Sequence, residues 1–373
     1  MKPEIKIAVI DDGVSKIAFE DLHFDFEVDG RQNVKQRVKK QIKHDSHGTA
    51  CAQIIKHYAP GAVIGSIKIL DSKTHSGFVE SLEAAVEWCL TNDVSLVNLS
   101  LGSTKSRDHK ALKKIVDFSY DNGLIIVAAS SNKDVVSYPA SFANVIGVSL
   151  DSALTEDLYY IVQPDIRGID VYASSNHSSL ELKSISGYGN SYAAPVVTAK
   201  VYDIMTTNYT SDIDKIKAEL SKKTCKRKKG QTHNNQTLSR KLEIPCIVLL
   251  FASADCQKII SELNEFFYTN EYNTLALSTI KYGDCDNILQ LSQSELNDSA
   301  ISNIRCMFDT DIILLGIAES DLTQDVKISS DILFSEKENY SSELLLFEKQ
   351  ILFHIENNNV VEDIYTKIVD YLT

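Results

Sequence analysis

The chain has 373 residues, of which 43% are hydrophobic and 8% aromatic, and its formal net charge is −13. This length and composition are typical of a globular protein with two or three domains and a full hydrophobic core. No apolar run approaches the ~18 residues that a membrane-spanning helix needs, which excludes a membrane-spanning protein. The acidic C-terminal third does not favour binding to nucleic-acid phosphates, which excludes a nucleic-acid-binding protein.

Residues 1–220 alternate between strand-like and helix-like segments. Runs of Val, Ile and Leu predict strands at 5–10, 63–69, 95–99, 124–129 and 145–148. Helical patterns lie near 49–57, 78–90, 110–120 and 192–206. Apolar strands between amphipathic helices indicate an α/β fold with a parallel sheet that helices cover on both faces. Ligands of such sheets bind beyond the carboxyl ends of the strands, and Asp11 stands at that position.

A basic segment separates this region from a second α/β pattern. Residues 221–242 are rich in Lys and Arg and contain no Asp or Glu, which predicts an exposed linker. The acidic residues 243–373 form the third part, with strands predicted at 244–251, 274–278, 311–316 and 332–334 and helices at 256–267, 342–356 and 360–372. This alternation predicts a small Rossmann-like or flavodoxin-like α/β domain.

The function of residues 243–373 stays open at this level. Only Gly283 and Gly316 occur there, whereas a phosphate-binding loop needs several glycines, so a nucleotide sensor is the lesser interpretation. A docking surface for a partner, or for a second copy in a homo-oligomer, is the more natural one.

The seven cysteines are odd in number and show neither CxxC nor Cys/His ligand spacing. Free thiols in a reducing compartment therefore explain them better than a disulfide framework, and we expect no metal site and no cofactor. The opening segment MKPEIKIAVI lacks the basic and long apolar regions of a signal peptide. We therefore expect the protein to be cytoplasmic.

Three short segments carry reactive side chains. They are IKIAVIDDG around Asp11, DSHGTAC around His47 and GYGNSYAAP around Ser191. Together they supply a carboxylate to orient a base, an imidazole to act as the base, and a hydroxyl to act as the nucleophile. Ser191 stands at the start of a predicted helix, where free N–H groups favour negative charge on a substrate oxygen.

Each of these residues has a rival or a simpler explanation. His44 and His57 are close to His47, but His44 lacks the Gly-Thr that follows His47, and His57 lies at the far end of the predicted helix. Asp12 is chemically equal to its neighbour Asp11, and it either raises the local negative charge or faces solvent. Taken alone, Ser191 reads as an ordinary helix-capping serine.

The three segments, in the order Asp, His, Ser, resemble the subtilisin-like serine peptidase family over residues 1–220. The resemblance implies that Asp11, His47 and Ser191 form a catalytic triad. LIIVAASSN resembles the segment that ends in the family's oxyanion-binding asparagine, which implies that role for Asn132. The family has Thr where Asn190 stands, and an asparagine at that position can also donate to the oxyanion.

The resemblance also implies a substrate-binding site. VNLSLGS at 97–103 is similar to the family segment that pairs with the substrate backbone as an added strand. One wall of the pocket for the P1 side chain would be Ser100, Leu101 and Gly102, and the other would be Ala129, Ser130 and Ser131. The family often has Gly where Ser131 stands, so its Cβ and hydroxyl are expected to narrow the pocket.

The expected function is that of a cytoplasmic serine endopeptidase that acts on a peptide or protein substrate. The additional domain favours selective processing over bulk digestion, for example the removal of a leader segment from a precursor peptide. The alternative is a binding or scaffold protein that kept the fold and lost the catalytic rate, which the departures at Asn190 and Ser131 motivate. The sequence leaves open whether calcium or an activation step is needed.

Overall fold

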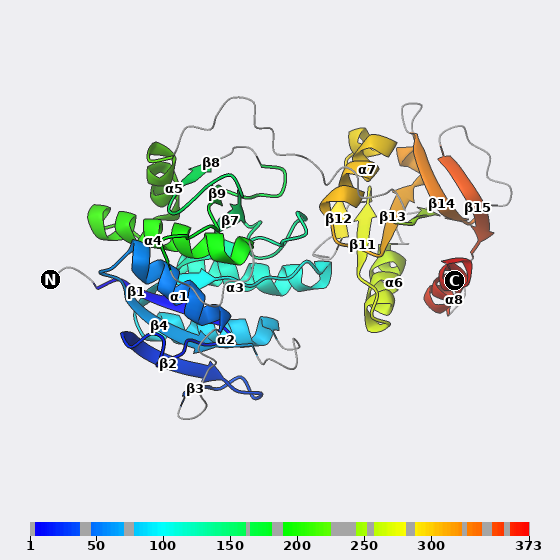
Figure 1. Ribbon diagram of the computed structural model, residues 1–373. Helices are drawn as coiled ribbons and strands as arrows, with labels where there is room; N and C mark the ends of the chain where they lie inside the picture. Colours follow the sequence, from blue (N-terminus) through cyan, green and yellow to red (C-terminus); the bar gives the residue numbers. More distant parts are fainter. Residues whose placement is uncertain are drawn as a thin grey trace. The chain divides into compact units, whose positions relative to one another are not determined.

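The computed structural model of the chain separates into two compact units, one formed by residues 1–104 and 111–231 and the other by 105–110 and 232–373. Figure 1 shows their elements in sequence colours. One of the three boundaries, between residues 231 and 232, lies in the segment predicted to be a basic linker. The structure describes residues 4–37, 46–70, 78–161, 165–180, 189–224, 244–251, 257–280, 288–322, 327–337, 345–353 and 359–372.

The first unit is built on a nine-stranded sheet with the order β3-β2-β4-β1-β5-β6-β7-β9-β8. Its neighbouring strands run parallel except at the two edges, where β2 pairs with β3 and β9 with β8 in antiparallel fashion. The strands are β1 (Lys6–Asp11), β2 (Leu22–Val28), β3 (Val34–Gln36), β4 (Val63–Lys68), β5 (Val94–Leu99), β6 (Ile125–Ala129), β7 (Ile146–Leu150), β8 (Tyr159–Ile161) and β9 (Val171–Ala173).

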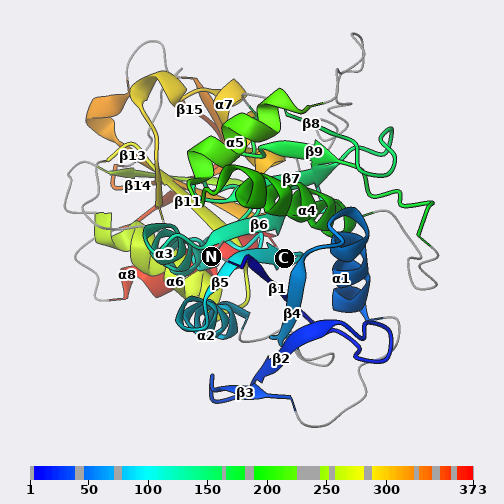
Figure 2. The ribbon, with the colours of Figure 1, turned by 90° about the vertical axis from the view of Figure 1, so that its left-hand side faces the viewer.

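Helices cover both faces of this sheet, as Figure 2 shows. One face carries α1 (His47–Tyr58), α4 (Asn190–Asn208) and α5 (Ile213–Lys222). The opposite face carries α2 (Phe78–Thr91) and α3 (His109–Asp121), and one 3-10 turn (Ser106–Asp108) precedes α3. The central strands are buried almost throughout because helices lie on both of their sides. The predicted subtilisin-like parallel sheet with helices on both faces is therefore confirmed.

The second unit contains a six-stranded, wholly parallel sheet with the order β12-β11-β13-β10-β14-β15. Helices α6 and α8 pack on one face against residues such as Leu249, and α7 packs on the other face against residues such as Val248. The elements are β10 (Cys246–Phe251), α6 (Gln257–Thr269), β11 (Thr274–Ser278), β12 (Ile288–Gln290), α7 (Asp298–Met307), β13 (Ile312–Ala318), β14 (Ile328–Ser335), β15 (Leu345–Leu352) and α8 (Val360–Leu372), with short 3-10 turns at Gln293–Glu295 and Glu319–Asp321.

One predicted element of the second unit is wrong in type. Residues 342–356 were expected to form a helix, but Leu345–Leu352 is the edge strand β15, paired with β14 along its length. Short apolar runs fit both periodicities, and pairing with a neighbouring strand decided the outcome here. Helix α7 and strand β12 were not predicted; β12 is only three residues long, and half of the residues of α7 are polar. None of the described helices is long and apolar enough to cross a membrane.

Candidate active site

Asp11 is the last residue of β1, at the carboxyl edge of the sheet in the first unit. Its side chain is almost wholly buried. One carboxylate oxygen, Oδ1, accepts a hydrogen bond of 2.8 Å from the backbone N–H of Asp12. The other, Oδ2, lies 2.8 Å from Nδ1 of His47. The two bonds fix the carboxylate, so it holds one nitrogen of the imidazole in place.

His47 is the first residue of α1, directly after the helix-capping Ser46. Since the Asp11 carboxylate accepts the proton of Nδ1, the neutral ring presents the lone pair of Nε2, which is the form that a general base requires. Burial by itself lowers the pKa of His47, while Cys51 and the Asp11 carboxylate raise it, and the balance lies above the ordinary histidine value.

Asp12 supports the start of the same helix. Its carboxylate accepts hydrogen bonds from the backbone N–H groups of Gly48 at 2.9 Å and His47 at 3.3 Å. Two of the free N–H groups of α1 are thus satisfied by a carboxylate at the positive end of the helix dipole. Burial, and then the charge of Asp11, raise the pKa of Asp12. The second carboxylate therefore positions the backbone of His47 rather than simply facing solvent.

Gly48 allows α1 to approach the end of β1. A β-carbon at this position would lie 2.8 Å from the carbonyl oxygen of Gly13 and 3.1 Å from Cβ of Asp11. The first distance is shorter than β-carbons adopt and the second is tight, so a larger residue would push the start of the helix away from the end of β1. The Gly that follows His47 in the sequence is therefore a condition for the contact between His47 and Asp11.

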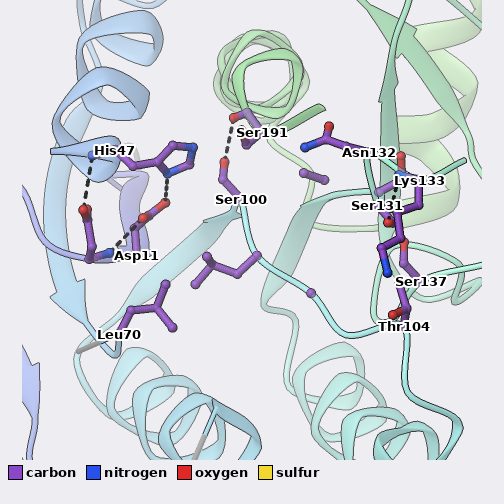
Figure 3. A pocket seen from close by; sticks show the side chains of 15 residues that line it. Asp11, His47, Leu70, Ser100, Thr104, Ser131, Asn132, Lys133, Ser137 and Ser191 are labelled. Atoms are coloured by element: carbon purple, nitrogen blue, oxygen red, sulfur yellow. Dashed lines mark hydrogen bonds and ion pairs between the residues drawn. The ribbon is translucent and has the colours of Figure 1, made fainter. Parts of the chain in front are cut away.

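Ser191 is the second residue of α4 and lines the same cleft as His47 and Asp11 (Figure 3). Because Pro195 has no N–H, the carbonyl of Ser191 lacks its partner within the helix. The Ser100 hydroxyl donates to that carbonyl instead, at 2.9 Å. Among the described residues, no hydrogen bond joins the Ser191 hydroxyl to the His47 ring, and such bonds are often long without a substrate.

Asn132 lies beside the Ser191 hydroxyl. A β-carbon at Gly189 would sit 3.4 Å from Oγ of Ser191 and 3.7 Å from Nδ2 of Asn132, so both groups border the same small volume. Oδ1 of Asn132 accepts a hydrogen bond of 2.9 Å from the backbone N–H of Asn190. This bond fixes the amide and leaves its N–H₂ group for a ligand in the cleft.

Asn190 does not join the cleft. Its buried Nδ2 donates to the carbonyl oxygens of Ser130 at 3.1 Å and Ser131 at 2.8 Å, and its Oδ1 accepts from the backbone N–H of Leu150 at 2.7 Å. These hydrogen bonds engage both the N–H₂ group and the oxygen of the Asn190 side chain, and they join α4 to the ends of β6 and β7. This differs from the expectation of an oxyanion donor: the side chain holds the loop that carries Asn132.

The six residues expected to contact substrate all line one cleft of about 490 Å³ together with the triad candidates. The segment with Gly102 is held by a two-way bridge between Ser103 and Tyr138, with both N–O distances 2.8 Å. A β-carbon at Gly102 would lie 2.8 Å from the Tyr138 carbonyl oxygen. The lining residues are Asp11, Asp12, His47, Leu70, Ser100, Leu101, Gly102, Thr104, Ala129, Ser130, Ser131, Asn132, Lys133, Ser137 and Ser191.

Two neighbours of the imidazole were not predicted. The Tyr192 ring packs on the His47 ring with 5.2 Å between their centroids. The Cys51 sulfur lies 3.9 Å from Nδ1 of His47, and Cys51 follows His47 by four residues, a spacing that places both on one face of a helix. Of the rival histidines, His57 bonds to Ser179, and His44 lies outside the described residues.

The fold and this cleft define a class of protein: a parallel α/β protein with a carboxylate–imidazole pair, a serine and an amide donor around one cavity. Comparison with known proteins is consistent with that class. The model of the subtilase family matches residues 2–240, and the chain belongs to this family of serine peptidases. The match does not cover the remaining C-terminal part.

Individual relatives match parts of the chain. Minor extracellular protease Epr of Bacillus subtilis is 36% identical over 157 residues, which are 39% of this chain and 23% of Epr. Subtilisin DY of Bacillus licheniformis is 26% identical over 240 residues, 58% of this chain and 82% of that protein. Subtilisin E of Bacillus subtilis is 31% identical over 160 residues, which are 39% of this chain and 40% of subtilisin E. The chain thus spans less than half the length of Epr and subtilisin E.

Two solved structures match part of the chain at low sequence identity. The epidermin leader peptide processing serine protease from Staphylococcus aureus has a TM-score of 0.48 and 17% identity, covering 62% of this chain and 72% of its own. The nisin leader peptidase NisP from Lactococcus lactis has a TM-score of 0.42 and 14% identity, and the match covers 58% of this chain and 81% of the NisP chain.

Proposed function

We propose that the chain is a serine endopeptidase whose catalytic residues are Asp11, His47 and Ser191. The observation that carries the proposal is the 2.8 Å contact between the Asp11 carboxylate and Nδ1 of His47 in a cleft that Ser191 also lines. A buried carboxylate bound to one ring nitrogen leaves the other nitrogen free to take a proton from a hydroxyl.

The reaction then follows from the positions of these groups. Nε2 of His47 removes the proton of the Ser191 hydroxyl as its oxygen attacks the carbonyl carbon of the substrate. The negative charge that forms on the carbonyl oxygen is stabilised by the Asn132 amide and the free N–H of Ser191 at the start of α4. His47 returns the proton to the leaving amine, which gives an acyl-enzyme, and water repeats the sequence to release the acid.

The substrate is proposed to be a peptide in extended conformation. The Ser100–Gly102 segment continues from β5 along the cleft, so its backbone offers an edge for an added strand, and the P1 side chain then lies between Leu101 and Ala129. We further propose selective processing, such as the removal of a leader segment from a precursor. The second unit contains none of the cleft residues, and we propose that it docks a partner or another copy.

A diverse peptide library tests activity and selectivity together. Incubation with the full-length protein, followed by mass spectrometry, is expected to give products that share a residue preference at P1. The matched control is Ser191→Ala, which keeps the cleft but lacks the nucleophile. Products that appear equally with the Ser191→Ala variant, or no products from the folded wild-type protein, contradict the proposal.

A catalytically weak binding protein is the second candidate. The missing hydrogen bond between the Ser191 hydroxyl and His47 and the structural use of the Asn190 side chain favour it. Under this alternative, peptides from the library bind the cleft without being cut. Equilibrium binding to the Ser191→Ala variant, compared with cleavage by the wild type, separates the two functions.

A reducing, cytoplasmic location is proposed as well. Cys51, Cys89, Cys246 and Cys306 are free thiols, three of them buried. Free cysteines are typical of proteins that fold in the cytoplasm rather than in an oxidising compartment. When intact cells are treated with an alkylating reagent before lysis, the thiol of the half-buried Cys306 is expected to react without prior reduction.

A further inference from the structure

The base and the nucleophile of the proposed reaction stand on two neighbouring helices. His47 is the first residue of α1, and Ser191 is the second residue of α4. The two helices share one hydrophobic core on the same face of the sheet (Figure 2). Apolar contacts between helices have no preferred direction, so they permit small shifts. The distance between the Ser191 hydroxyl and the imidazole therefore depends on directional bonds that join α1 to α4.

A buried histidine outside the cleft forms such bonds to both helices. His177 is 6% exposed. Its Nε2 lies 3.0 Å from the carbonyl oxygen of Tyr192, the residue after Ser191. Its Nδ1 lies 3.2 Å from the hydroxyl of Tyr58, the last residue of α1. One imidazole thus connects the start of α4 to the end of α1.

A carboxylate fixes both the phenol and the segment that carries His177. Oε2 of Glu156 accepts a hydrogen bond of 2.9 Å from the Tyr58 hydroxyl. Oε1 of Glu156 accepts from the Ser178 hydroxyl at 2.6 Å and from the backbone N–H of Ser179 at 3.2 Å. Hydrogen bonds from the Ser178 and Ser179 hydroxyls lower the pKa of Glu156 to about 2. The carboxylate is therefore charged wherever a histidine base is active.

The bridge through His177 persists in both protonation states of its ring. A carbonyl oxygen only accepts hydrogen bonds, so Nε2 carries a proton toward Tyr192 in either state. In the neutral state the Tyr58 hydroxyl donates to Nδ1, and Glu156 keeps its serine donors. In the charged state Nδ1–H donates to the Tyr58 oxygen, and the phenol donates to Glu156. Burial lowers the pKa of His177, which favours the neutral state.

The bond to Tyr192 acts on both reacting groups. Since Tyr192 directly follows Ser191, a fixed Tyr192 carbonyl fixes the backbone of the nucleophile. The Tyr192 ring also packs on the His47 ring, with 5.2 Å between their centroids. Among the described residues, no hydrogen bond joins the Ser191 hydroxyl to the imidazole, so their approach depends on the backbone that carries them.

We propose that His177 is a positioning residue that fixes the spacing between α1 and α4 and so holds the Ser191 hydroxyl within reach of the His47 base. This role rests on the proposed peptidase function. Without the bond to Tyr192, the start of α4 is free to shift, and a displacement of about 1 Å is expected to cost about 10²-fold in turnover. KM is expected to change little, because His177 does not contact the substrate cleft.

Two amide substitutions separate the two bonds of the ring. His177→Gln places an N–H₂ group near the position of Nε2 and keeps the donor to Tyr192, whereas His177→Asn places its amide near Nδ1 and keeps only the contact with Tyr58. His177→Asn is expected to lower kcat about 10²-fold and His177→Gln less than about fivefold, with KM within about twofold in both. The control is His23→Gln, an exposed histidine on β2, which is expected to change neither constant.

A measurement without turnover shows whether Tyr192 moves. In the Ser191→Ala variant, the NMR signal of the His47 Cε1 proton is shifted by the ring current of Tyr192. Adding His177→Asn is expected to change this signal, because the Tyr192 ring leaves its place on the imidazole. Adding His177→Gln is expected to leave the signal in place.

The possible outcomes separate this proposal from the proposed function. Equal losses of kcat in His177→Gln and His177→Asn, wild-type kcat in both, or a change confined to KM would overturn the positioning role. If the His177 variants do not fold, Tyr58→Phe decides: it removes only the hydroxyl and is expected to lower kcat about tenfold, and wild-type kcat in that variant contradicts the bridge. A wild type that cleaves no peptide contradicts the peptidase, and the His47 signal then still decides whether His177 holds Tyr192.

Discussion

The two units of the molecule share an architecture and differ in what stands at the ends of their strands. Both have a sheet of mainly parallel strands with helices on both faces. In the first unit, β1 ends at Asp11, β5 is followed by Ser100, and β6 is followed at a short distance by Asn132, and these side chains line one cleft. Three strand ends thus supply a carboxylate, a hydroxyl and an amide to one cavity.

At the ends of β11 and β14 in the second unit, serine hydroxyls form hydrogen bonds with nearby residues of their own chain segment. The Ser278 hydroxyl at the end of β11 accepts from the backbone N–H of Ile280 at 3.1 Å. The Ser335 hydroxyl at the end of β14 donates to the carbonyl oxygen of Lys337 at 2.9 Å, and the Lys337 ammonium pairs with Glu319 at 2.5 Å. The fold class alone therefore does not create a site; the difference lies in whether polar groups at the strand ends are left for a ligand.

The largest expected effect is that of removing the base from the first unit. His47→Ala is expected to lower the turnover number on the order of 10⁶-fold, because the Ser191 hydroxyl then has nothing to take its proton. Steady-state hydrolysis of a peptide identified in the library measures it. The matched control is Lys258→Ala on the exposed surface of α6 in the second unit. Equal losses of turnover in His47→Ala and Lys258→Ala would contradict the account, because the second unit would then matter to catalysis as much as the proposed base does.

The oxyanion assignment predicts the next largest effect. Asn132→Ala is expected to lower the turnover number about 10²–10³-fold with little change in KM, since the amide acts on charge that forms only in the transition state. Asn132→Asp is the isosteric companion and is expected to be at least as slow, because its carboxylate repels the oxyanion. A change confined to KM would show that Asn132 only binds substrate.

The close approach of α1 to β1 is tested by Gly48→Ala. The added β-carbon meets the Gly13 carbonyl oxygen, so the start of the helix moves and carries His47 away from Asp11. A displacement of about 1 Å is expected to cost about 10²-fold in turnover. Gly61→Ala, whose β-carbon would have 3.5 Å to its nearest neighbour, is the control. Wild-type activity of Gly48→Ala would contradict this account of the glycine.

The raised pKa of His47 predicts the pH dependence. The base must be neutral, so kcat/KM is expected to fall about tenfold per pH unit as the pH drops below that pKa, and the plateau lies on the alkaline side of an ordinary histidine. Asp11→Asn removes a charge that favours the protonated ring and is expected to move the titration to lower pH. NMR titration of the His47 ring in both proteins checks this shift, and identical titrations would contradict it.

The smallest expected effect on activity comes from the core of the second unit. Leu249 lies on β10 and is fully buried in the core that this strand shares with α6 and α8. Leu249→Ala is expected to destabilise that unit by about 2–5 kcal/mol, seen by calorimetry of the full chain, while the rate of Ser191 labelling changes less than twofold. A loss of labelling in parallel with the loss of stability would mean that the second unit is needed to form the site.

Much of the site was predictable from the sequence because its key residues stand in short segments at strand and helix ends. Asp11 follows an apolar strand, and His47 begins a helix after a capping serine, so the local pattern gives their place, whereas the roles proposed for them rest on the resemblance to the subtilase family. The parallel order of the central strands also follows from the alternation of strand and helix signals.

What could not be predicted depends on contacts between distant segments. The capping of α1 by Asp12 joins residues from β1 and α1, and the use of the Asn190 amide depends on where β6 and β7 end. Neither partner is visible in the neighbouring sequence. The strand at Leu345–Leu352 was missed for the same reason, because its pairing with β14 overrode a pattern that also fits a helix.

Covalent labelling of the intact protein with a fluorophosphonate, followed by mass spectrometry of its peptides, tests the central claim most directly. The account predicts one adduct, on the hydroxyl of residue 191, that disappears in the serine-to-alanine variant and forms far more slowly without the imidazole of residue 47. A folded protein that takes up no label, or carries it on a different serine, would contradict it.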